Sequence, residues 1–300
     1  MREELFKNCT LCPQKCNVNR LEGKRGYCGM DSTIRAARAA LHMWEEPCIS
    51  GKKGSGAVFF SGCGLRCCFC QNRDIAIGDS GKEISVERLA EIFLELQEKG
   101  AANLNLVTGA HYVPHIISAL ELARGKGMNL PVVYNSSGYE SVETIRRLDG
   151  YVDVYLPDMK YMEPELAAAF SNARDYPQAA QSAIAEMMRQ TGPCQFAEDG
   201  YIKRGTIVRH LILPGHTKNS IAVLKYLYRT YGEDIFISVM NQYTPVWKNE
   251  KFPELNRKVT RREYEKVLDA AIELGIENGY FQEGETAEES FIPAFDYEGV

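Results

Sequence analysis

The residues best suited to chemistry lie between Cys63 and Asn72, in the run CGLRCCFCQN. Cys63, Cys67 and Cys70 have the spacing C-x3-C-x2-C and follow the apolar run 57–60, which is typical of a buried strand. Thiolates are the usual protein ligands of iron–sulfur clusters, and three thiolates this close can hold one cluster of four irons. Three ligands leave one iron without a side chain, and an open position distinguishes a catalytic metal site from a closed structural one. The spacing therefore predicts a 4Fe-4S cluster that is open to a small molecule.

Two plainer explanations exist for these three cysteines, namely a zinc site or thiols that only pack in the core. Cysteines this close together seldom serve packing alone, and the adjacent Cys68 already provides a small apolar side chain there. A non-catalytic iron–sulfur or zinc protein is the alternative from a different functional class.

The cysteine run resembles the signature of the radical S-adenosylmethionine (SAM) superfamily, C-x3-C-x-aromatic-C, with Phe69 in the aromatic position beside the adenine. Residues 70–72, Cys-Gln-Asn, further resemble the branch of pyruvate formate-lyase activating enzyme. The resemblance implies that SAM binds the open iron and is cleaved reductively to methionine and a 5′-deoxyadenosyl radical, which abstracts hydrogen. It also implies an electron donor such as flavodoxin or ferredoxin. The substrate would be a glycyl radical enzyme or, alternatively, a peptide or small molecule.

The length, charge and hydrophobic pattern of the chain indicate a globular protein without a nucleic-acid groove or a membrane span. A chain of 300 residues suits one large core with a small appendage. The net charge of −5, without a long basic run, gives no support for a nucleic-acid groove. No apolar stretch approaches the roughly 20 residues of a membrane span, and the charged residues 2–4 do not resemble a secretory signal. We therefore expect a cytoplasmic protein with neither a nucleic-acid nor a membrane partner.

A second group of cysteines lies near the amino terminus, at Cys9, Cys12, Cys16 and Cys28. Nine of the ten cysteines fall within the first 70 residues, which favours metal binding over disulfides. Four thiolates form a closed set, suited either to tetrahedral zinc or to a fully ligated second cluster that could pass electrons inward. The sequence does not decide between the two metals. Cys48 is either a spare ligand or a buried thiol.

From residue 57 onward, apolar runs alternate with helical stretches. Strands are expected at 57–61, 103–107, 131–134, 152–156, 206–213 and 235–239, with a short last strand at 280–282. Helices are expected at 35–44, at 86–99, from Pro114, after Ser141, within 164–190, near Asn219 and at Thr260. Repeated strand–helix units predict an α/β fold with a parallel sheet. The resemblance implies a partial (β/α)6 barrel with its chemistry at the carboxyl ends of the strands.

The expected domain organisation has three parts. A Cys-rich amino-terminal segment covers residues 1–55, and the radical SAM core covers residues 56–282. The tail, residues 283–300, mixes acidic residues with aromatic and aliphatic ones, and we expect it to pack on the core.

Residues that follow the strands are the candidates for holding SAM. The resemblance assigns Gly109 to the amino group of SAM, and Asn135 and Ser136 to a turn near its ribose and methionine. Asp158, with Asn135 and Ser136, would form an oxygen cage for a monovalent cation beside the SAM carboxylate. The alternatives are an ordinary polar turn and a surface ion pair between Asp158 and Lys160.

Two charged or polar residues interrupt the fifth strand, where burial is costly without partners. Arg209 is predicted to contact the SAM carboxylate or ribose, because its planar fork suits such oxygens. Neighbours on a strand point to opposite faces, so the sequence leaves open whether Arg209 or His210 points inward. Gln242 is expected to contact adenine or substrate, and His111 to lie at the mouth of the site.

Overall fold

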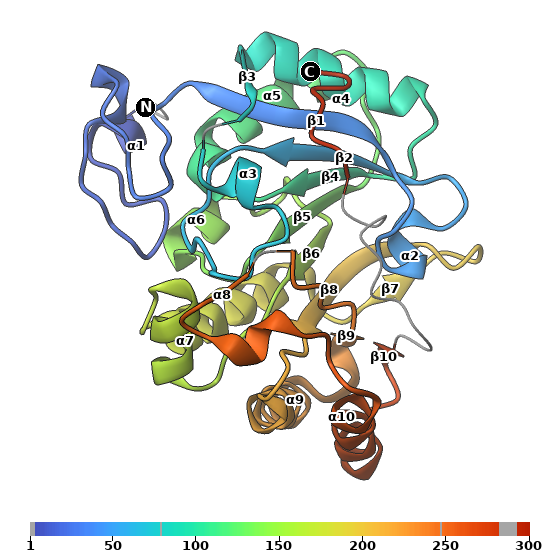
Figure 1. Cartoon of the computed structure of the whole chain (residues 1–300). Coiled ribbons are helices and arrows are strands. Elements are labelled where there is room, and N and C mark those ends of the chain that lie inside the picture. The colour runs from blue at the N-terminus through green and yellow to red at the C-terminus, as the bar shows by residue number, and fades with distance from the viewer. Residues whose placement is uncertain (1–3, 79, 247, 282–292) are drawn as a thin grey trace.

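A computed structural model describes residues 4–78, 80–246, 248–281 and 293–300 (Figure 1). The main sheet has the strand order β10-β9-β8-β6-β5-β4-β2-β1-β3, and β7 pairs with β8 off this path. The strands are β1 (Ile34–His42), β2 (Ser55–Phe60), β3 (Lys82–Ile84), β4 (Leu104–Val107), β5 (Val132–Ser136), β6 (Val154–Pro157), β7 (Gln195–Phe196), β8 (Ile202–Leu211), β9 (Phe236–Met240) and β10 (Gly279–Phe281).

The run of strands from β2 to β10 along this order is parallel. The longer helices are α4 (Val86–Glu98), α5 (Val113–Gly125), α6 (Val142–Arg147), α7 (Pro164–Ser171), α8 (Tyr176–Thr191), α9 (Thr217–Tyr231) and α10 (Arg261–Leu274). They cover the outer face of the curved sheet (Figure 1). The predicted α/β fold with a partial barrel is confirmed.

Local signals for the helix starts are also confirmed. The side chain of Ser85 accepts a hydrogen bond from the backbone of Arg88 and caps α4, and Ser141 caps α6 in the same way. Thr260 and Glu263 form a reciprocal capping box at the start of α10.

One expected element is wrong. Residues 35–44 were expected to be helical, but they belong largely to β1, which pairs antiparallel with β2 and with β3. The alanines of this segment favour a helix in isolation. Here they are buried between neighbouring strands, and pairing on both sides overrides the local preference.

The last described residues lie along the outer edge of β1 (Figure 1). The backbone N–H of Tyr297 donates to the carbonyl of Ala37 at 3.1 Å, and that of Ala39 donates to Glu298 at 2.8 Å. Arg38 forms an ion pair with Asp296 at 2.6 Å. The first part of the expected tail, residues 283–292, and Gln282 of the expected last strand lie outside the described residues.

Three short helices connect the sheet to the site: α1 (Glu4–Lys7), α2 (Pro47–Ser50) and α3 (Arg73–Ala76). The short 3-10 helices are Arg20–Glu22, Ala110–Tyr112, Gly232–Asp234 and Pro253–Asn256. Within the described ranges, no helix is long and apolar enough to cross a bilayer.

Candidate active site

A cavity of about 690 Å³ lies at the carboxyl ends of the parallel strands, a volume typical of ligand sites. The ends of β2, β4, β5, β8 and β9, the residue after β6 and the segment before α2 all contribute side chains to its wall. The predicted location of the chemistry therefore coincides with the large cavity.

Cys63, Cys67 and Cys70 line this cavity together. The Ser171 hydroxyl donates to the Cys67 sulfur at 3.0 Å, and the backbone N–H of Cys70 donates to the Cys67 carbonyl at 3.1 Å. Burial first, and then the neighbouring thiols, raise the pKa of Cys67 to about 11 and that of Cys70 to about 12. A bound cation is therefore needed to keep these sulfurs ionised at neutral pH, and thiolate donors of this kind fit an iron–sulfur cluster.

The described residues contain no group of three or more His, Cys, Asp or Glu side chains close enough to hold one metal ion. A cluster of four irons holds its thiolates farther apart than a single ion does. The spacing of Cys63, Cys67 and Cys70 is therefore judged against a four-iron cluster and not against a single metal ion.

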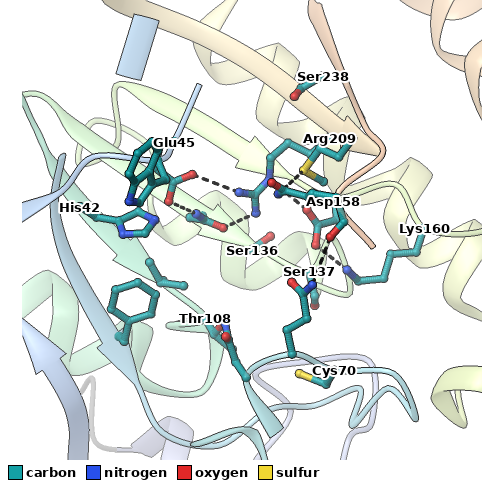
Figure 2. A pocket seen from close by; sticks show the side chains of 18 of the residues that line it. His42, Glu45, Cys70, Thr108, Ser136, Ser137, Asp158, Lys160, Arg209 and Ser238 are labelled. Carbon is teal, nitrogen blue, oxygen red and sulfur yellow. Dashed lines mark hydrogen bonds and ion pairs between the residues drawn. The ribbon is translucent and has the colours of Figure 1, made fainter. Parts of the chain in front are cut away.

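Arg209 lies at the centre of the polar wall, between Glu45 and Asp158 (Figure 2). Its Nε donates to Asp158 Oδ1 at 3.0 Å, and its Nη1 donates to Glu45 Oε2 at 3.2 Å. Its Nη2 donates to Asn135 Oδ1 at 2.5 Å. Three separate segments of the chain thus converge on the guanidinium of Arg209.

The two carboxylates beside Arg209 differ in their electrostatics. Burial alone would raise the pKa of Asp158, but Lys160 and Arg209 together hold it below its ordinary value. Lys160 Nζ forms an ion pair with Asp158 Oδ2 at 2.5 Å, and it also lowers the pKa of Cys67. In Glu45, burial outweighs the attraction of Arg209 and raises the pKa. Asp158 is therefore the firmly ionised partner of the pair.

Of the three side chains expected to surround a monovalent cation, Asp158 and Asn135 already have cationic partners, and Ser136 has a backbone partner. Asp158 accepts from both Arg209 and Lys160, and Asn135 Oδ1 accepts from Arg209. The Ser136 hydroxyl accepts from the backbone N–H of Gly138 at 3.1 Å. In this arrangement two side-chain cations take up the oxygens that the resemblance assigns to a metal cation.

The expected SAM contacts fall into two groups. Those that line the cavity are Asn135, Ser136, Asp158, Arg209 and Gln242. Phe69 and Gly109 are outside its described lining.

The ring of Phe69 packs in the core beside Phe170 and Tyr243, with both centroids 6.2 Å away. Gly109 faces the core as well, where an added Cβ would lie 2.6 Å from Ile116 Cδ1. The residue before it, Thr108, lines the cavity with a φ of +60°, a conformation that is strained for a β-branched side chain. The turn after β4 thus presents Thr108 to the cavity.

His111 and His210 do not line the cavity and hydrogen-bond backbone carbonyls instead. His210 points away from the cavity, where its Nδ1 hydrogen-bonds the carbonyl of Met159 at 2.7 Å, and Arg209 is the inward residue of the pair. His111 is buried and its Nε2 hydrogen-bonds the carbonyl of Ser61 at 2.7 Å, so its expected place at the mouth is wrong. Burial lowers the pKa of His111 to about 3 and that of His210 to about 4.

The segment before α2 supplies side chains that sequence reasoning missed. Glu45, Glu46 and Trp44 reach the cavity, and Asn105 and Asn135 both donate to Glu45 Oε1 at 3.1 Å. The only sequence signal was two adjacent acids before a proline, which is equally typical of an exposed turn. Cys48, in α2 itself, is a buried thiol packed among aliphatic side chains.

The loops of the amino-terminal segment, which carry Cys9, Cys12, Cys16 and Cys28, lie at one side of the barrel (Figure 1). The thiols of Cys9 and Cys28 raise the pKa of Cys12, and those of Cys9 and Cys16 raise the pKa of Cys28, after the larger effect of burial. A Cβ added at Gly64 would lie 3.5 Å from Cys12 Sγ. This four-cysteine set therefore packs directly against the loop that begins at Cys63.

Arg20 joins this segment to the barrel. It is fully buried (0% exposed), and its Nη1 donates to the carbonyl of His111 at 2.7 Å and to Cys9 Sγ at 3.9 Å. Its Nε donates to the carbonyl of Asp31 at 3.0 Å, and the Phe6 ring centroid lies 4.9 Å away. No carboxylate of the described residues forms an ion pair with Arg20. A buried cation without a carboxylate is costly, and negative charge on neighbouring thiolates would offset that cost.

Comparison with known proteins shows several relatives. The uncharacterized protein MJ0674 of Methanocaldococcus jannaschii is 30% identical over 276 residues, which are 90% of this chain and 75% of that protein. The pyruvate formate-lyase-activating enzyme of Clostridium pasteurianum is 27% identical over 113 residues, which are 36% of this chain and 46% of that enzyme.

Solved structures show weaker similarity. SuiB from Streptococcus suis has a TM-score of 0.46 and 13% identity, covering 77% of this chain and 48% of that one. The AdoMet-bound anSMEcpe structure has a TM-score of 0.48 and 12% identity, covering 71% of this chain and 57% of that one. This chain thus corresponds to about half the length of those proteins.

The model of the radical SAM superfamily matches residues 57–227, which is more than half of the chain. The family implies a 4Fe-4S cluster and SAM as cofactors, and the cavity with its three cysteines fits both. The chain therefore belongs to the radical SAM superfamily, and it is a radical SAM enzyme.

Proposed function

We propose that this enzyme uses Cys63, Cys67 and Cys70 to hold its catalytic cluster and the wall of the same cavity to hold SAM. The observation that carries the proposal is that these three thiols open into one cavity with Asn135, Ser136 and Arg209, rather than into closed protein. When bound, the cluster supplies the electron that cleaves SAM to methionine and a 5′-deoxyadenosyl radical.

The protein's own part is to position and shield. Arg209 fixes Asp158 and Asn135 in one geometry, so the polar wall is organised before any ligand binds. We infer that the N–H groups of Arg209 that face the cavity bind the carboxylate or ribose oxygens of SAM. Gln242, at the end of β9, would contact the adenine or the substrate. Enclosure by the strand ends keeps water from the reacting groups.

Production of 5′-deoxyadenosine tests this proposal. Anaerobically reconstituted protein with SAM and dithionite should form it, and Cys68→Ala should behave like the native chain. A native chain that retains its cluster and binds SAM, yet forms no 5′-deoxyadenosine, would favour the non-catalytic alternative.

For the substrate, we propose hydrogen abstraction from a glycyl residue of a partner enzyme. The partial similarity to pyruvate formate-lyase-activating enzyme supports this choice. A glycyl radical should appear by electron paramagnetic resonance in a partner only when this protein, SAM and a reductant are present. If a peptide or small molecule is instead modified under the same conditions, the glycyl proposal is wrong.

We also propose that the amino-terminal set, Cys9, Cys12, Cys16 and Cys28, binds a metal. The support is that these thiols influence one another's pKa and that the buried charge of Arg20 lies beside Cys9. Among the described residues the thiols are not within reach of one single ion, so metal binding would draw them closer together. Iron, sulfide and zinc analysis distinguishes the two candidates. Four irons with stoichiometric zinc would exclude a second cluster that relays electrons from flavodoxin or ferredoxin. The free thiols throughout the described chain are consistent with a reducing, cytoplasmic setting.

A further inference from the structure

Glu46 occupies a place in the cavity that binding of SAM by the cysteines and Arg209 does not explain. Its residue is only 8% exposed, yet it belongs to the cavity lining. Ser238 hydrogen-bonds its carboxylate, but Glu46 Oε2 has no hydrogen-bond partner among the described residues. Leaving a buried carboxylate oxygen without a partner costs stability, and natural proteins seldom accept that cost without a function.

The charges of the lining show an excess of acid. The described carboxylates are Glu45, Glu46 and Asp158, and the cations are Arg209 and Lys160. Arg209 forms ion pairs with Glu45 and Asp158, Lys160 forms one with Asp158, and no described cation forms one with Glu46. Burial raises the pKa of Glu46 more than the attraction of Arg209 lowers it, so a bound cation would favour its ionised form.

His42 also lines the cavity but does not supply the missing charge. Burial, together with Arg209 and Arg38, lowers its pKa and keeps the imidazole neutral. Trp44 lines the same cavity and is 60% exposed, so its indole forms part of the entrance. Aromatic faces attract ammonium and guanidinium groups, which adds a second feature that favours a cation.

We propose that Glu46 binds a positively charged nitrogen group of the substrate, an ammonium or a guanidinium, which enters past Trp44. The inference rests on the proposed function only in taking this cavity as the place where substrate meets SAM. An ammonium or guanidinium in the cavity would donate to the carboxylate of Glu46 and balance the third carboxylate of the lining. The substrate would then carry a lysine, arginine or amine group rather than an acidic one; a glycyl radical enzyme would meet this requirement with a basic side chain beside its glycine.

Calorimetric titration with small probes tests the site directly. The reconstituted protein, saturated with SAM, is titrated with n-butylammonium, n-butylguanidinium and neutral 1-butanol. We expect the two cations to bind at least about tenfold more tightly than the alcohol, because a charge-assisted hydrogen bond is lost with the alcohol. Equal binding of cation and alcohol by the native chain would overturn the proposal, whatever the variants do.

Two substitutions at the same position sharpen the result. Glu46→Gln should weaken cation binding by about tenfold or more, whereas Glu46→Asp should retain the preference for cations over the alcohol. Glu186→Gln is the matched control, since Glu186 is equally buried but lies outside the cavity and is paired with Arg189. Unchanged cation affinity in a folded Glu46→Gln protein would contradict the assignment.

SAM itself carries an ammonium group, so the titration is repeated without SAM. If SAM abolishes probe binding, Glu46 serves the cofactor and the substrate assignment is wrong. If probes bind equally well with and without SAM, the site belongs to the substrate. Probe binding needs no turnover, so a native chain that binds the cations but forms no 5′-deoxyadenosine would reject only the proposed function.

Discussion

The chain contains two sets of clustered cysteines with opposite surroundings. The sulfurs of Cys63, Cys67 and Cys70 open into a cavity of about 690 Å³. None of the amino-terminal set lines this cavity; Cys9 and Cys28 are buried, Cys12 and Cys16 are partly buried, and Cys12 lies beside the Gly64 turn. Identical ligand atoms can thus serve an open or a closed centre, and the walls around them make the difference.

Each set of cysteines has a cationic side chain beside it, and the two cations differ in whether a carboxylate balances them. Lys160 lies near Cys67 but is shared with Asp158, so its charge is already balanced. Arg20 lies beside Cys9 and Cys28 and has carbonyls and aromatic rings as its other partners. Negative charge beside Arg20 would therefore stabilise the amino-terminal set, whereas Arg209 and Lys160 beside the cavity cysteines are already paired with Glu45 and Asp158.

The largest expected effect separates the two sets by activity. Cys67→Ala should abolish 5′-deoxyadenosine formation, because one ligand of the catalytic cluster is lost. Cys12→Ala should leave dithionite-driven cleavage of SAM within about tenfold of the native rate, because the closed set does not face the cavity. Chromatographic assay of 5′-deoxyadenosine measures both. Equal losses in the two variants would remove the distinction between open and closed centres.

The next effect concerns the wall of the open centre. Arg209→Met leaves Asp158 and Glu45 without their guanidinium, and it should lower the free energy of unfolding by about 3–5 kcal/mol. Urea unfolding measures the change, with the exposed Arg261→Met as the control. A loss no greater than that of the control would show that the wall is not held together by this charge.

Arg20→Met tests the closed centre in the same way. Removing the buried cation beside Cys9 should weaken metal retention at the amino-terminal set by about 10–100-fold, the usual range for groups that support metal ligands. Chelator competition followed by metal analysis measures the change. Faster metal loss from the cavity cysteines instead would show that Arg20 supports the other set.

A smaller effect is expected from pH, through one buried histidine on each side of the comparison. The carbonyl of His111 accepts a hydrogen bond from Arg20, and His210 follows Arg209 on β8. Burial lowers the pKa of His111 to about 3 and that of His210 to about 4. Both imidazoles are neutral when folded and take up protons when unfolded. Each therefore contributes stability that is present above about pH 6.5 and is lost as pH falls toward its folded value, with a slope of up to about 1.4 kcal/mol per pH unit.

Denaturant unfolding between about pH 4 and about pH 7 tests this slope. His210→Asn and His111→Gln retain a donor for the carbonyls of Met159 and Ser61, and each should flatten the curve by its share. An unchanged slope in both variants would mean that other groups control acid unfolding.

The smallest expected effect is an absence of change. Because Arg209 and Lys160 already bind the oxygens of Asp158 and Asn135, replacing potassium by tetramethylammonium should leave SAM cleavage unaffected in the native chain. In Arg209→Met the freed oxygens suit a hard cation, and potassium should then stimulate cleavage or stabilise the fold. Strong potassium dependence of the native enzyme would show that a metal cation displaces Arg209 or Lys160 from these oxygens.

The sequence could predict what depends on local spacing. The cysteine run, the parallel strands and the helix caps at Ser85, Ser141 and Thr260 all follow from residues close together in the chain. It also placed Asn135, Asp158 and Arg209 at strand ends, where the structure brings them into contact.

What the sequence could not predict depends on segments that meet only in the folded chain. Residues 35–44 become a strand because β2 and β3 lie on both sides of them. That strand carries Glu45 and Glu46 into the polar wall, where partners from β4, β5, β8 and β9 determine their environment. Thr108 lines the cavity and Gly109 does not, because the glycine is packed against Ile116.

Arg20 has a consequence for the order in which the enzyme matures. Its guanidinium spans a carbonyl of the helical turn after β4 and a sulfur near the amino terminus. If the amino-terminal cysteines bind a metal as proposed, the Arg20 contact that supports them would form only once a segment some ninety residues downstream has reached its place. Occupancy of the peripheral centre would then report that the barrel beneath it is complete, and a half-built chain would remain unmetallated.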